Sequence, residues 1–255
     1  MTKQQKLLET PKAYSDQSVK LERINSMDNQ QGNLQEIMQD FFKHMAYSIG
    51  AMTGDGSINQ YAYVDNRNHK EYTGYNVQFR CSDKWCVDYV CHEINHVFYK
   101  DYKVTSYENP NGTTMYQVVS GNRSLYMFYK YFIMEKLNIP DEAFRSSRDS
   151  QLNYIAGLFD TDGYVTESNG YYRVGFGSRH RTFVEDLSRM MQKLGVKIGK
   201  IHEQISQYNT RMFIIKPNIR SFIESGCHFT IPRKVDKLAK YGIAVKPSET
   251  IMLNP

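Results

Sequence analysis

IAGLFDTDG occupies residues 155–163, and a looser copy, SIGAMTGDG, occupies residues 48–56. In each copy an apolar helical segment with small residues runs into an Asp-Gly pair, and strand-like sequence follows. An Asp-Gly pair after a helix is by itself an ordinary turn. Two copies at matching positions instead predict a duplicated fold, in which Asp55 and Asp162 end equivalent helices.

Small residues define one face of each motif helix. Gly50 and Gly54 are four residues apart, and Gly157 and Thr161 match them in the second copy. Residues at this spacing lie on the same helix face. Small side chains there allow two helix backbones to approach closely. We therefore expect the motif helices to pack side by side as the joint between two halves, with their terminal aspartates close together.

The same order of elements, α-β-β-α-β-β-α, is predicted in each half. The alternation of apolar and polar residues predicts two four-stranded antiparallel sheets, each with one apolar face for helices and one open polar face. The fold class is therefore α+β with two pseudo-symmetric halves. The chain divides into a polar N-terminal arm (1–33), a first half (34–137), a linker (138–149), a second half (150–241) and a C-terminal tail (242–255).

Individual elements follow from the periodicity of apolar residues. Asp83 is expected to cap the helix that follows it. In the first half we expect helices at 34–53, 84–100 and 122–137, and strands at 57–64, 73–81, 102–107 and 113–119. In the second half we expect helices at 150–161, 180–194, 218–225 and 233–241, and strands at 163–168, 171–178, 197–204 and 210–216.

Composition narrows the class of protein. Hydrophobic residues make up 40% and charged residues 23% of the 255-residue chain, as in a globular protein. No apolar run approaches the length of a membrane span, and no signal-peptide pattern opens the chain. We therefore expect an intracellular protein, in the cytoplasm of a prokaryote or phage host or in an organelle matrix. The net charge of +5 permits a polyanionic partner. The four cysteines fit no zinc-finger spacing, so buried free thiols are expected.

The pair of aspartates suggests metal chemistry. Two carboxylates held close together repel each other unless cations bridge them. Mg²⁺, or Mn²⁺ in its place, suits carboxylate, carbonyl, water and phosphate oxygens. A metal-bound water can attack a phosphodiester while the metal stabilises the leaving oxygen. A nearly symmetric substrate fits a duplicated fold, and double-stranded DNA is such a substrate.

The motifs resemble the signature of the LAGLIDADG homing endonucleases. The second copy is close to it, whereas the first has Ser48 and Ile49 in place of the usual Leu-Ala and Thr53 where the second copy has Asp160. Both copies keep the acidic position before the last Gly. The resemblance extends over roughly residues 37–241, and two motifs in one chain make it similar to the single-chain, pseudo-dimeric members.

This resemblance implies a monomer shaped as a saddle, whose polar sheet faces lie over the DNA major groove. It implies a long, nearly palindromic target and staggered cleavage of both strands. It also implies divalent metals held by Asp55 and Asp162, with help from the backbone carbonyls of Gly54 and Thr161.

The family also places basic groups around the metals. Lys234 is the best candidate for a catalytic role in the second half, with Arg233 beside it as a DNA contact. Residues 139–141 align with 231–233 but end in Asp instead of Arg, and Lys136 could compensate. The two metal centres are therefore expected to differ in the basic residues around them.

The polar faces of the strands form the expected DNA-reading surface. Arg pairs with guanine and Asn or Gln with adenine in the major groove. Alternation places four residues on this surface: Asn76, Gln78, Arg80 and Arg173. Arg211 and Lys216 are further candidates, but they differ in parity, so at most one faces DNA without a bulge.

His92, Glu93 and His96 match the HExxH zinc-protease motif. Their helix already has a place in the repeat, and the equivalent helix at 180–194 lacks the motif. No third ligand follows at a familiar spacing. We therefore expect both histidines on the solvent side and no zinc peptidase.

Three functions remain open at this stage. The first is a site-specific double-strand DNA endonuclease. The second is an intron maturase, or another RNA- or DNA-binding protein of the same fold without cleavage, with intron RNA as its partner. The presence of both acids favours the nuclease. An intein is a third, but a splicing domain needs more residues than this chain has.

Overall fold

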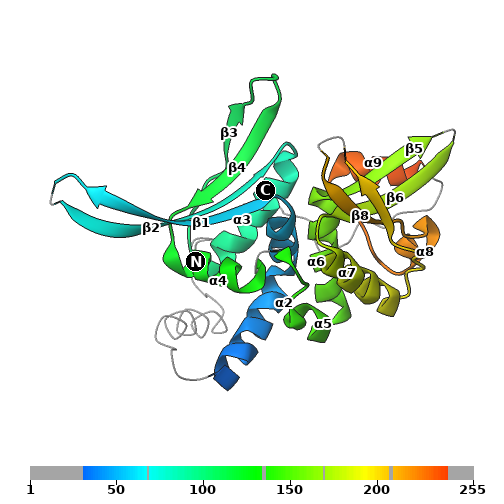
Figure 1. Ribbon diagram of the computed structural model, residues 1–255, viewed down its shortest axis with the longest axis horizontal. Coiled ribbons are helices and arrows are strands. Elements are labelled where there is room, and N and C mark those ends of the chain that lie inside the picture. Colours follow the sequence, from blue (N-terminus) through cyan, green and yellow to red (C-terminus); the bar gives the residue numbers. More distant parts are fainter. Residues whose placement is uncertain (1–30, 68, 134–135, 169, 207–208, 241–255) are drawn as a thin grey trace, which may run out of the picture.

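The computed structural model describes residues 31–240 except 68, 134–135, 169 and 207–208. Two motif helices, α2 (Gln31–Asp55) and α6 (Arg148–Thr161), pack against each other at its centre (Figure 1). A Cβ atom on Gly50 would overlap the carbonyl oxygen of Tyr154, and one on Gly157 would overlap that of Tyr47. The absence of side chains at these two glycines therefore sets the distance between the helices.

Each half contains a four-stranded antiparallel sheet. The first holds β1 (Gly56–Asp65), β2 (Lys70–Cys81), β3 (Thr105–Glu108) and β4 (Thr114–Ser120) in the order β1-β2-β4-β3. The second holds β5 (Gly163–Ser168), β6 (Tyr171–Ser178), β7 (His202–Ile205) and β8 (Arg211–Ile215) in the order β5-β6-β8-β7. The matching order confirms the predicted pair of pseudo-symmetric sheets (Figure 1).

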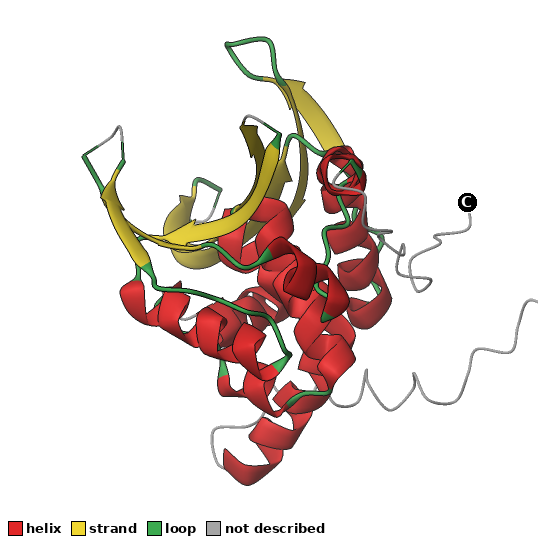
Figure 2. Ribbon diagram, turned by 90° about the vertical axis from the view of Figure 1, so that its right-hand side faces the viewer, coloured by secondary structure: helices red, strands yellow, loops and turns green. Residues whose placement is uncertain are grey.

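Helices cover one side of the sheets and leave the other side open (Figure 2). Val77, Phe79 and Cys81 alternate along β2 toward the helices and are buried, as predicted. The covering helices are α3 (Lys84–Phe98), α4 (Arg123–Ile133), α7 (Arg181–Lys193), α8 (Ile219–Glu224) and α9 (Pro232–Ala239). The short helix α5 (Asp141–Arg145) packs against α2 and α6 instead. Within the described ranges, no helix combines the length and apolar content that crossing a membrane requires.

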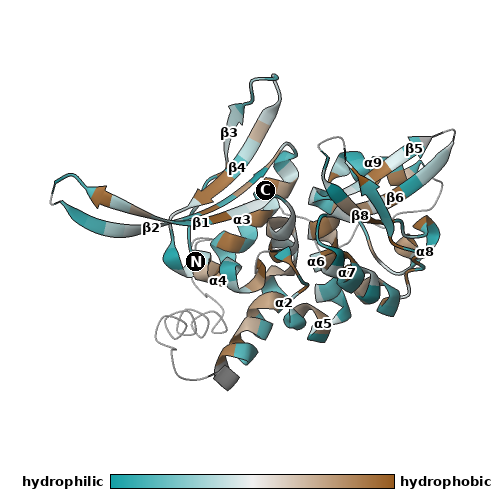
Figure 3. Ribbon diagram, in the orientation of Figure 1, coloured by the Kyte–Doolittle hydropathy of each residue, from teal (hydrophilic) through white to brown (hydrophobic). Residues whose placement is uncertain are grey.

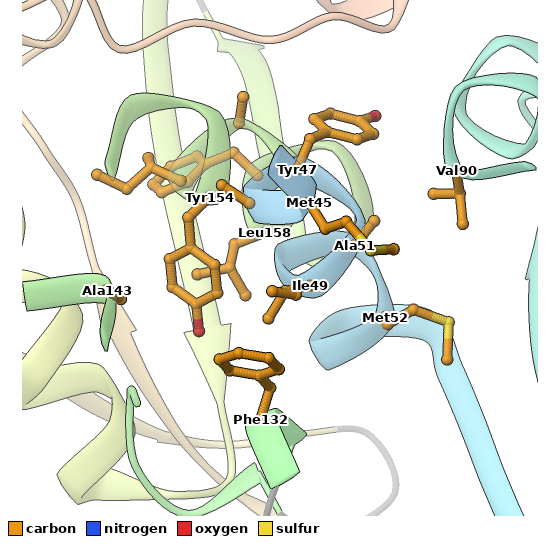
Figure 4. Close-up of a cluster of buried hydrophobic side chains, with 14 of the residues drawn as sticks. Met45, Tyr47, Ile49, Ala51, Met52, Val90, Phe132, Ala143, Tyr154 and Leu158 are labelled. Atoms are coloured by element: carbon orange, nitrogen blue, oxygen red, sulfur yellow. The ribbon is translucent and has the colours of Figure 1, made fainter. Parts of the chain in front are cut away.

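Aromatic residues fill the space between the motif helices and their neighbours. The ring of Phe42 lies 5.5 Å from that of Tyr154 and 5.8 Å from that of Phe132, measured between centroids. Figure 4 shows Tyr154 and Phe132 beside Ile49 and Leu158, so both motif helices and α4 share one core. All four cysteines are buried free thiols, as expected.

The predicted linker at 138–149 contains structure that its polar composition did not indicate. It holds α5, whose Ala143 is fully buried. Glu142 is also buried, and Tyr131 donates a hydrogen bond to it at 2.7 Å. Because one buried side of a five-residue helix shows too little periodicity, the sequence read as a connection.

Other boundaries also differ. The expected strand at 197–204 is shorter, because β7 begins at His202 and Ile198 forms only an isolated bridge with Pro217. The helix expected at 122–137 ends at Ile133. The predicted arm, 1–33, lies outside the described residues up to residue 30, and α2 already begins at Gln31. The predicted tail, 242–255, lies outside them entirely.

The close helix contact makes a stability prediction. Gly157→Ala should lower the free energy of unfolding by about 1–3 kcal/mol, because the new methyl group must push the α2 backbone away. Gly199→Ala is the matched control, since a Cβ at Gly199 meets nothing and its φ is not positive. Urea unfolding measures both. Equal stability of the two variants would contradict the tight contact.

Candidate functional site

The carboxyl ends of the motif helices meet at the floor of the open side. Asp55 is the last residue of α2, and Asp162 is the C-cap of α6. A Cβ atom on Gly54 would overlap the hydroxyl of Thr161 and lie 3.4 Å from the Asp162 carboxylate oxygen. Gly54 therefore contacts the end of α6, and the side chains of Asp55 and Asp162 belong to one cluster.

Electrostatics at this cluster disfavour two negative charges. Both aspartates are exposed at the surface, although nearby protein atoms displace part of their hydration. Loss of hydration, followed by the charge of Asp55, raises the pKa of Asp162 to about 6. Loss of hydration also raises the pKa of Asp55, against the opposing effect of Lys136 and Lys234. Helix carboxyl ends add partial negative charge, so the cluster favours cations.

One lysine approaches each helix end. Lys136 donates hydrogen bonds to the carbonyls of Gly54 at 2.7 Å and Gly56 at 3.3 Å. Lys234 donates to the carbonyls of Phe159, Asp160 and Gly163 at 2.6–2.8 Å. Burial lowers the pKa of both ammonium groups, and the acidic neighbours oppose this shift.

The two lysines thus occupy corresponding places. Lys234 was predicted from its position, whereas Lys136 appeared in the sequence only as a substitute. The alignment of Ile139-Pro140 with Ile231-Pro232 drew attention to Lys136, but Lys136 lies before that segment and Lys234 lies after it, so the alignment does not superpose the two lysines.

In the second half a buried carboxylate holds the segment that carries the lysine, and the first half has no such carboxylate at the matching motif position. The buried Asp160 accepts hydrogen bonds from the amides of Thr230 at 3.0 Å and Ile231 at 3.3 Å, and from the hydroxyl of Tyr47 at 2.8 Å. These bonds fix the segment that leads into α9, which carries Lys234. In the first half Thr53 donates instead to the carbonyl of Ile49 in its own helix, at 2.7 Å. The motif difference therefore changes how each lysine is held.

Arg233 forms a contact between the halves. Its guanidinium donates to the carboxylate of Asp83 at 2.6–3.0 Å, and this contact raises the pKa of Arg233. Asp83 is the N-cap of α3, but its side chain makes no capping hydrogen bond, contrary to expectation. The ion pair joins α9 to α3, so the side chain predicted to contact DNA is engaged within the protein.

The register of the sheets places most predicted reading residues on the open face. Asn76, Gln78 and Arg80 point away from the buried Val77 and Phe79. Gln78 donates to the side chain of Gln117 at 2.7 Å. Arg173 lies opposite Thr166 on the equivalent face of the second sheet, away from the buried Val174.

The register does not place Arg211 there. It shares the face of Phe213 and Ile215, which is the helix side, and pairs with Glu203 at 2.9 Å. Lys216 lies one residue beyond β8 and is exposed. The expected strand at 210–216 was too long by one residue at each end, which left the position of Lys216 relative to the sheet unresolved from sequence.

The HExxH residues are part of the fold. His92 and His96 are exposed, as expected. Glu93 points inward and accepts hydrogen bonds from the amide of Ser48 at 2.9 Å and from its hydroxyl. Burial raises the pKa of Glu93 to about 7. The contact ties α3 to α2 just after the backbone leaves helical geometry at Met45.

The donor set of the aspartate cluster limits which cation fits. Among the residues that the structure describes, no group of three or more His, Cys, Asp or Glu side chains could hold a metal ion. Two carboxylates with nearby carbonyls form an oxygen-only set, which suits Mg²⁺ completed by water and phosphate. The Gly54 carbonyl already accepts from Lys136, so the two helix ends differ.

Comparison with known families and proteins agrees with this architecture. Residues 149–225 match the LAGLIDADG-like domain. An uncharacterized protein of Methanocaldococcus jannaschii, MJ0314, is 19% identical over 183 residues. That match covers 70% of this chain but only 64% of the relative's length.

Solved structures extend the likeness to the whole fold. Mesophilic variants of the homing endonuclease I-DmoI match with a TM-score of 0.53 and 15% identity, over 81% of this chain and 99% of theirs. I-DmoI in complex with DNA and Ca matches with a TM-score of 0.55 and 16% identity, over 78% and 98%. I-DmoI has also been solved with DNA and Mn, with a TM-score of 0.52. The predicted resemblance is therefore confirmed: this chain has the fold of the single-chain, two-motif LAGLIDADG endonucleases.

The electrostatic strain at the cluster predicts a stability effect without metal. A pKa raised above its unfolded value lowers stability as pH rises from about 4 to 6, so Asp162 is destabilising at pH 8. Asp162→Asn in EDTA should stabilise the protein by roughly 1 kcal/mol or less after solvent screening.

Asp160→Asn is the matched comparison, and it should destabilise the protein by about 1–3 kcal/mol, because an amide cannot accept all of the hydrogen bonds from Thr230, Ile231 and Tyr47. Thermal unfolding at pH 8 measures both variants. Destabilisation by Asp162→Asn would contradict the strained cluster.

Proposed function

We propose that this chain is a site-specific endonuclease that cuts both strands of a long, pseudo-palindromic DNA site with divalent metal ions. The observation that carries the proposal is the cluster of Asp55 and Asp162 at the converging carboxyl ends of the motif helices, beneath two open polar sheets. Both acids come from one chain, so a monomer suffices.

The shape of the open side supports duplex DNA as the substrate. Two sheets with the same strand order diverge from a central helix pair, which matches the near-symmetry of a duplex around a central cleavage point. Their open faces carry the amide and guanidinium groups of Asn76, Gln78, Arg80 and Arg173. Such groups recognise base edges in the major groove. I-DmoI, which shares the fold, has been solved bound to DNA.

The chain's own groups divide the work of hydrolysis. Asp55 and Asp162 would hold the cations, with the carbonyls of Gly54 and Thr161 beside them. Bound Mg²⁺ or Mn²⁺ supplies an activated water and stabilises the leaving oxygen. Lys136 and Lys234 bring positive charge to the same floor and offset the charge that develops on the phosphate. Both aspartates are exposed, so the scissile phosphates can reach the carboxylates.

The aspartates should be required for cutting but not for binding. Asp55→Asn or Asp162→Asn should lower double-strand cleavage at least about 100-fold, because an amide cannot balance a divalent cation. Affinity for the same DNA should change little, since the sheets make most contacts. A plasmid-linearisation assay and a gel-shift assay measure the two effects.

Retention of full cleavage by either variant would refute the assigned roles. Sequence-selective binding without cleavage by the unmodified protein would instead favour a binding protein of the same fold, such as a maturase.

Metal should be required as well. EDTA should stop cleavage, and Mg²⁺ or Mn²⁺ should restore it. Binding of Mn²⁺ to the protein–DNA complex, followed by calorimetry, should weaken in Asp55→Asn and stay unchanged in Asp88→Asn, an acid on the outer side of α3 that pairs with Lys84. Cleavage that continues in EDTA would contradict the mechanism.

A further inference from the structure

Two of the four free cysteines contact each other where β2 passes into α3. Cys81 is the last residue of β2, and Cys86 lies in the first turn of α3. Figure 3 shows hydrophobic and hydrophilic residues mixed along α3, whose buried side includes Cys86. The two thiols form a hydrogen bond with each other. Sulfur atoms in such contact need only a small movement to form a disulfide.

The two thiols differ in reactivity. Cys86 is fully buried, whereas 7% of Cys81 is exposed. The hydrogen bond from Cys86, together with one from the amide of Asp83 at 3.5 Å, lowers the pKa of Cys81. The hydrogen bond to Cys81, followed by burial, raises the pKa of Cys86. Because the thiolate is the form that oxidants attack, Cys81 is the thiol that reacts first and Cys86 is placed to resolve it.

The other two cysteines lack these features. The thiol of Cys91 donates a hydrogen bond to the carbonyl of Tyr102 at 3.2 Å, and burial raises its pKa. Burial also raises the pKa of Cys227, to about 11. Both thiols are therefore protonated near neutral pH and react slowly. Oxidation should select Cys81 among the four.

The Cys86 thiol is connected to the second half through Tyr47. The hydroxyl oxygen of Tyr47 lies 3.2 Å from the sulfur of Cys86, and the hydroxyl donates to the carboxylate of Asp160 at 2.8 Å. Asp160 also accepts from the amide of Thr230 at 3.0 Å, and it thereby holds the segment before α9. A movement of the Cys86 sulfur therefore changes the contacts of Tyr47 and, through Asp160, those of Thr230.

The Cys81 thiol is connected to the same region through Asp83. The amide of Asp83 donates to Cys81, and its carboxylate accepts from Arg233 at 2.6–3.0 Å. Arg233 immediately precedes Lys234 in α9. The two connections start at different thiols, and both end within residues 230–234. This segment positions Lys234 at the end of the second motif helix.

We propose that hydroperoxides convert Cys81 and Cys86 to a disulfide, and that this disulfide loosens the segment that carries Lys234. The thiolate of Cys81 attacks one oxygen of the peroxide, which gives a sulfenic acid and releases the other oxygen as water after protonation. The sulfur of Cys86 then attacks the sulfur of Cys81, and the hydroxyl group leaves as a second water. Two thiols and one hydrogen peroxide thus give one disulfide and two waters, the sulfurs being oxidised and the peroxide oxygens reduced.

The disulfide changes both connections to the second half. The new bond draws the Cys86 sulfur toward Cys81 and away from the Tyr47 hydroxyl. It also removes the thiolate that accepts from the amide of Asp83. On the basis of the endonuclease function proposed above, the oxidised protein should cut DNA more slowly, because Lys234 loses its fixed position. Its affinity for DNA should change little, since the sheets make most contacts.

Mass spectrometry and hydrogen exchange test the inference on the full chain. Hydrogen peroxide should remove two hydrogen atoms and link residues 81 and 86, while Cys91 and Cys227 stay open to alkylation. The amides of Thr230 and Ile231 should exchange about tenfold faster in the oxidised protein, because their contacts with Asp160 weaken. Cleavage of DNA should fall about tenfold. Dithiothreitol should reverse all three effects.

Three variants identify the thiols. Cys86→Ser should stop at the sulfenic acid of Cys81, which dimedone traps, and its exchange at Thr230 should not respond to peroxide. Cys81→Ser should give neither the sulfenic acid nor the disulfide. Cys91→Ser is the matched control, because a serine hydroxyl can donate to the same Tyr102 carbonyl. It should respond to peroxide like the unmodified chain.

The outcomes separate this inference from the proposed function. A reversible disulfide between residues 81 and 86 with faster exchange at Thr230 and slower cleavage would support the inference. Absence of that disulfide at peroxide levels that oxidise Cys91 or Cys227, or a disulfide that leaves exchange or the rate of cleavage unchanged, would overturn it and leave the endonuclease proposal standing. A reduced chain that cuts no DNA would overturn the endonuclease proposal, and mass and exchange would then decide the inference alone.

Discussion

The approach of two helix backbones at Gly50 and Gly157 is the constraint on which the rest of the molecule depends. Each glycine faces a carbonyl oxygen of the other helix, so no side chain fits between them. The contact sets where the helices end, and it brings Gly54 against Thr161 and Asp162. The position of the acidic cluster, of the lysines around it and of the two pseudo-symmetric sheets depends on this distance between the helix backbones.

Local periodicity predicted what repeats, and it failed where contacts come from distant parts of the chain. The strands at 163–168 and 171–178 were predicted with the observed bounds, helped by the alternation of Tyr172, Val174 and Phe176 with polar or small residues in the second of them. The helix α5 was missed, since one short turn of helix gives no periodicity. The Arg233–Asp83 ion pair joins positions 150 residues apart, so no local sequence pattern predicts it. The acids could be found from sequence because two motifs marked them, whereas Lys136 has no motif of its own.

The two halves share the same order of elements, but different hydrogen bonds hold the segments next to the motif helices. Asp160 uses a buried carboxylate to hold the segment before α9, whereas Thr53 bonds within its own helix. The first half has its own partly buried acid in Glu93, which joins α3 to Ser48. Buried carboxylates cost hydration unless they accept several hydrogen bonds, and both of these do. A duplicated fold can thus keep one geometry while its supporting contacts diverge.

The Arg233–Asp83 contact also bears on how such a molecule can evolve. Asp83 belongs to the first half and is largely covered, with 16% of its side chain exposed, while its cation comes from the second half. Recombination that replaced either half with one from a distant relative would preserve the small residues of the helix seam but leave this carboxylate without its partner. Duplicated proteins that acquire such ion pairs between their halves lose the freedom to exchange one half alone, so the two halves are then inherited as one unit.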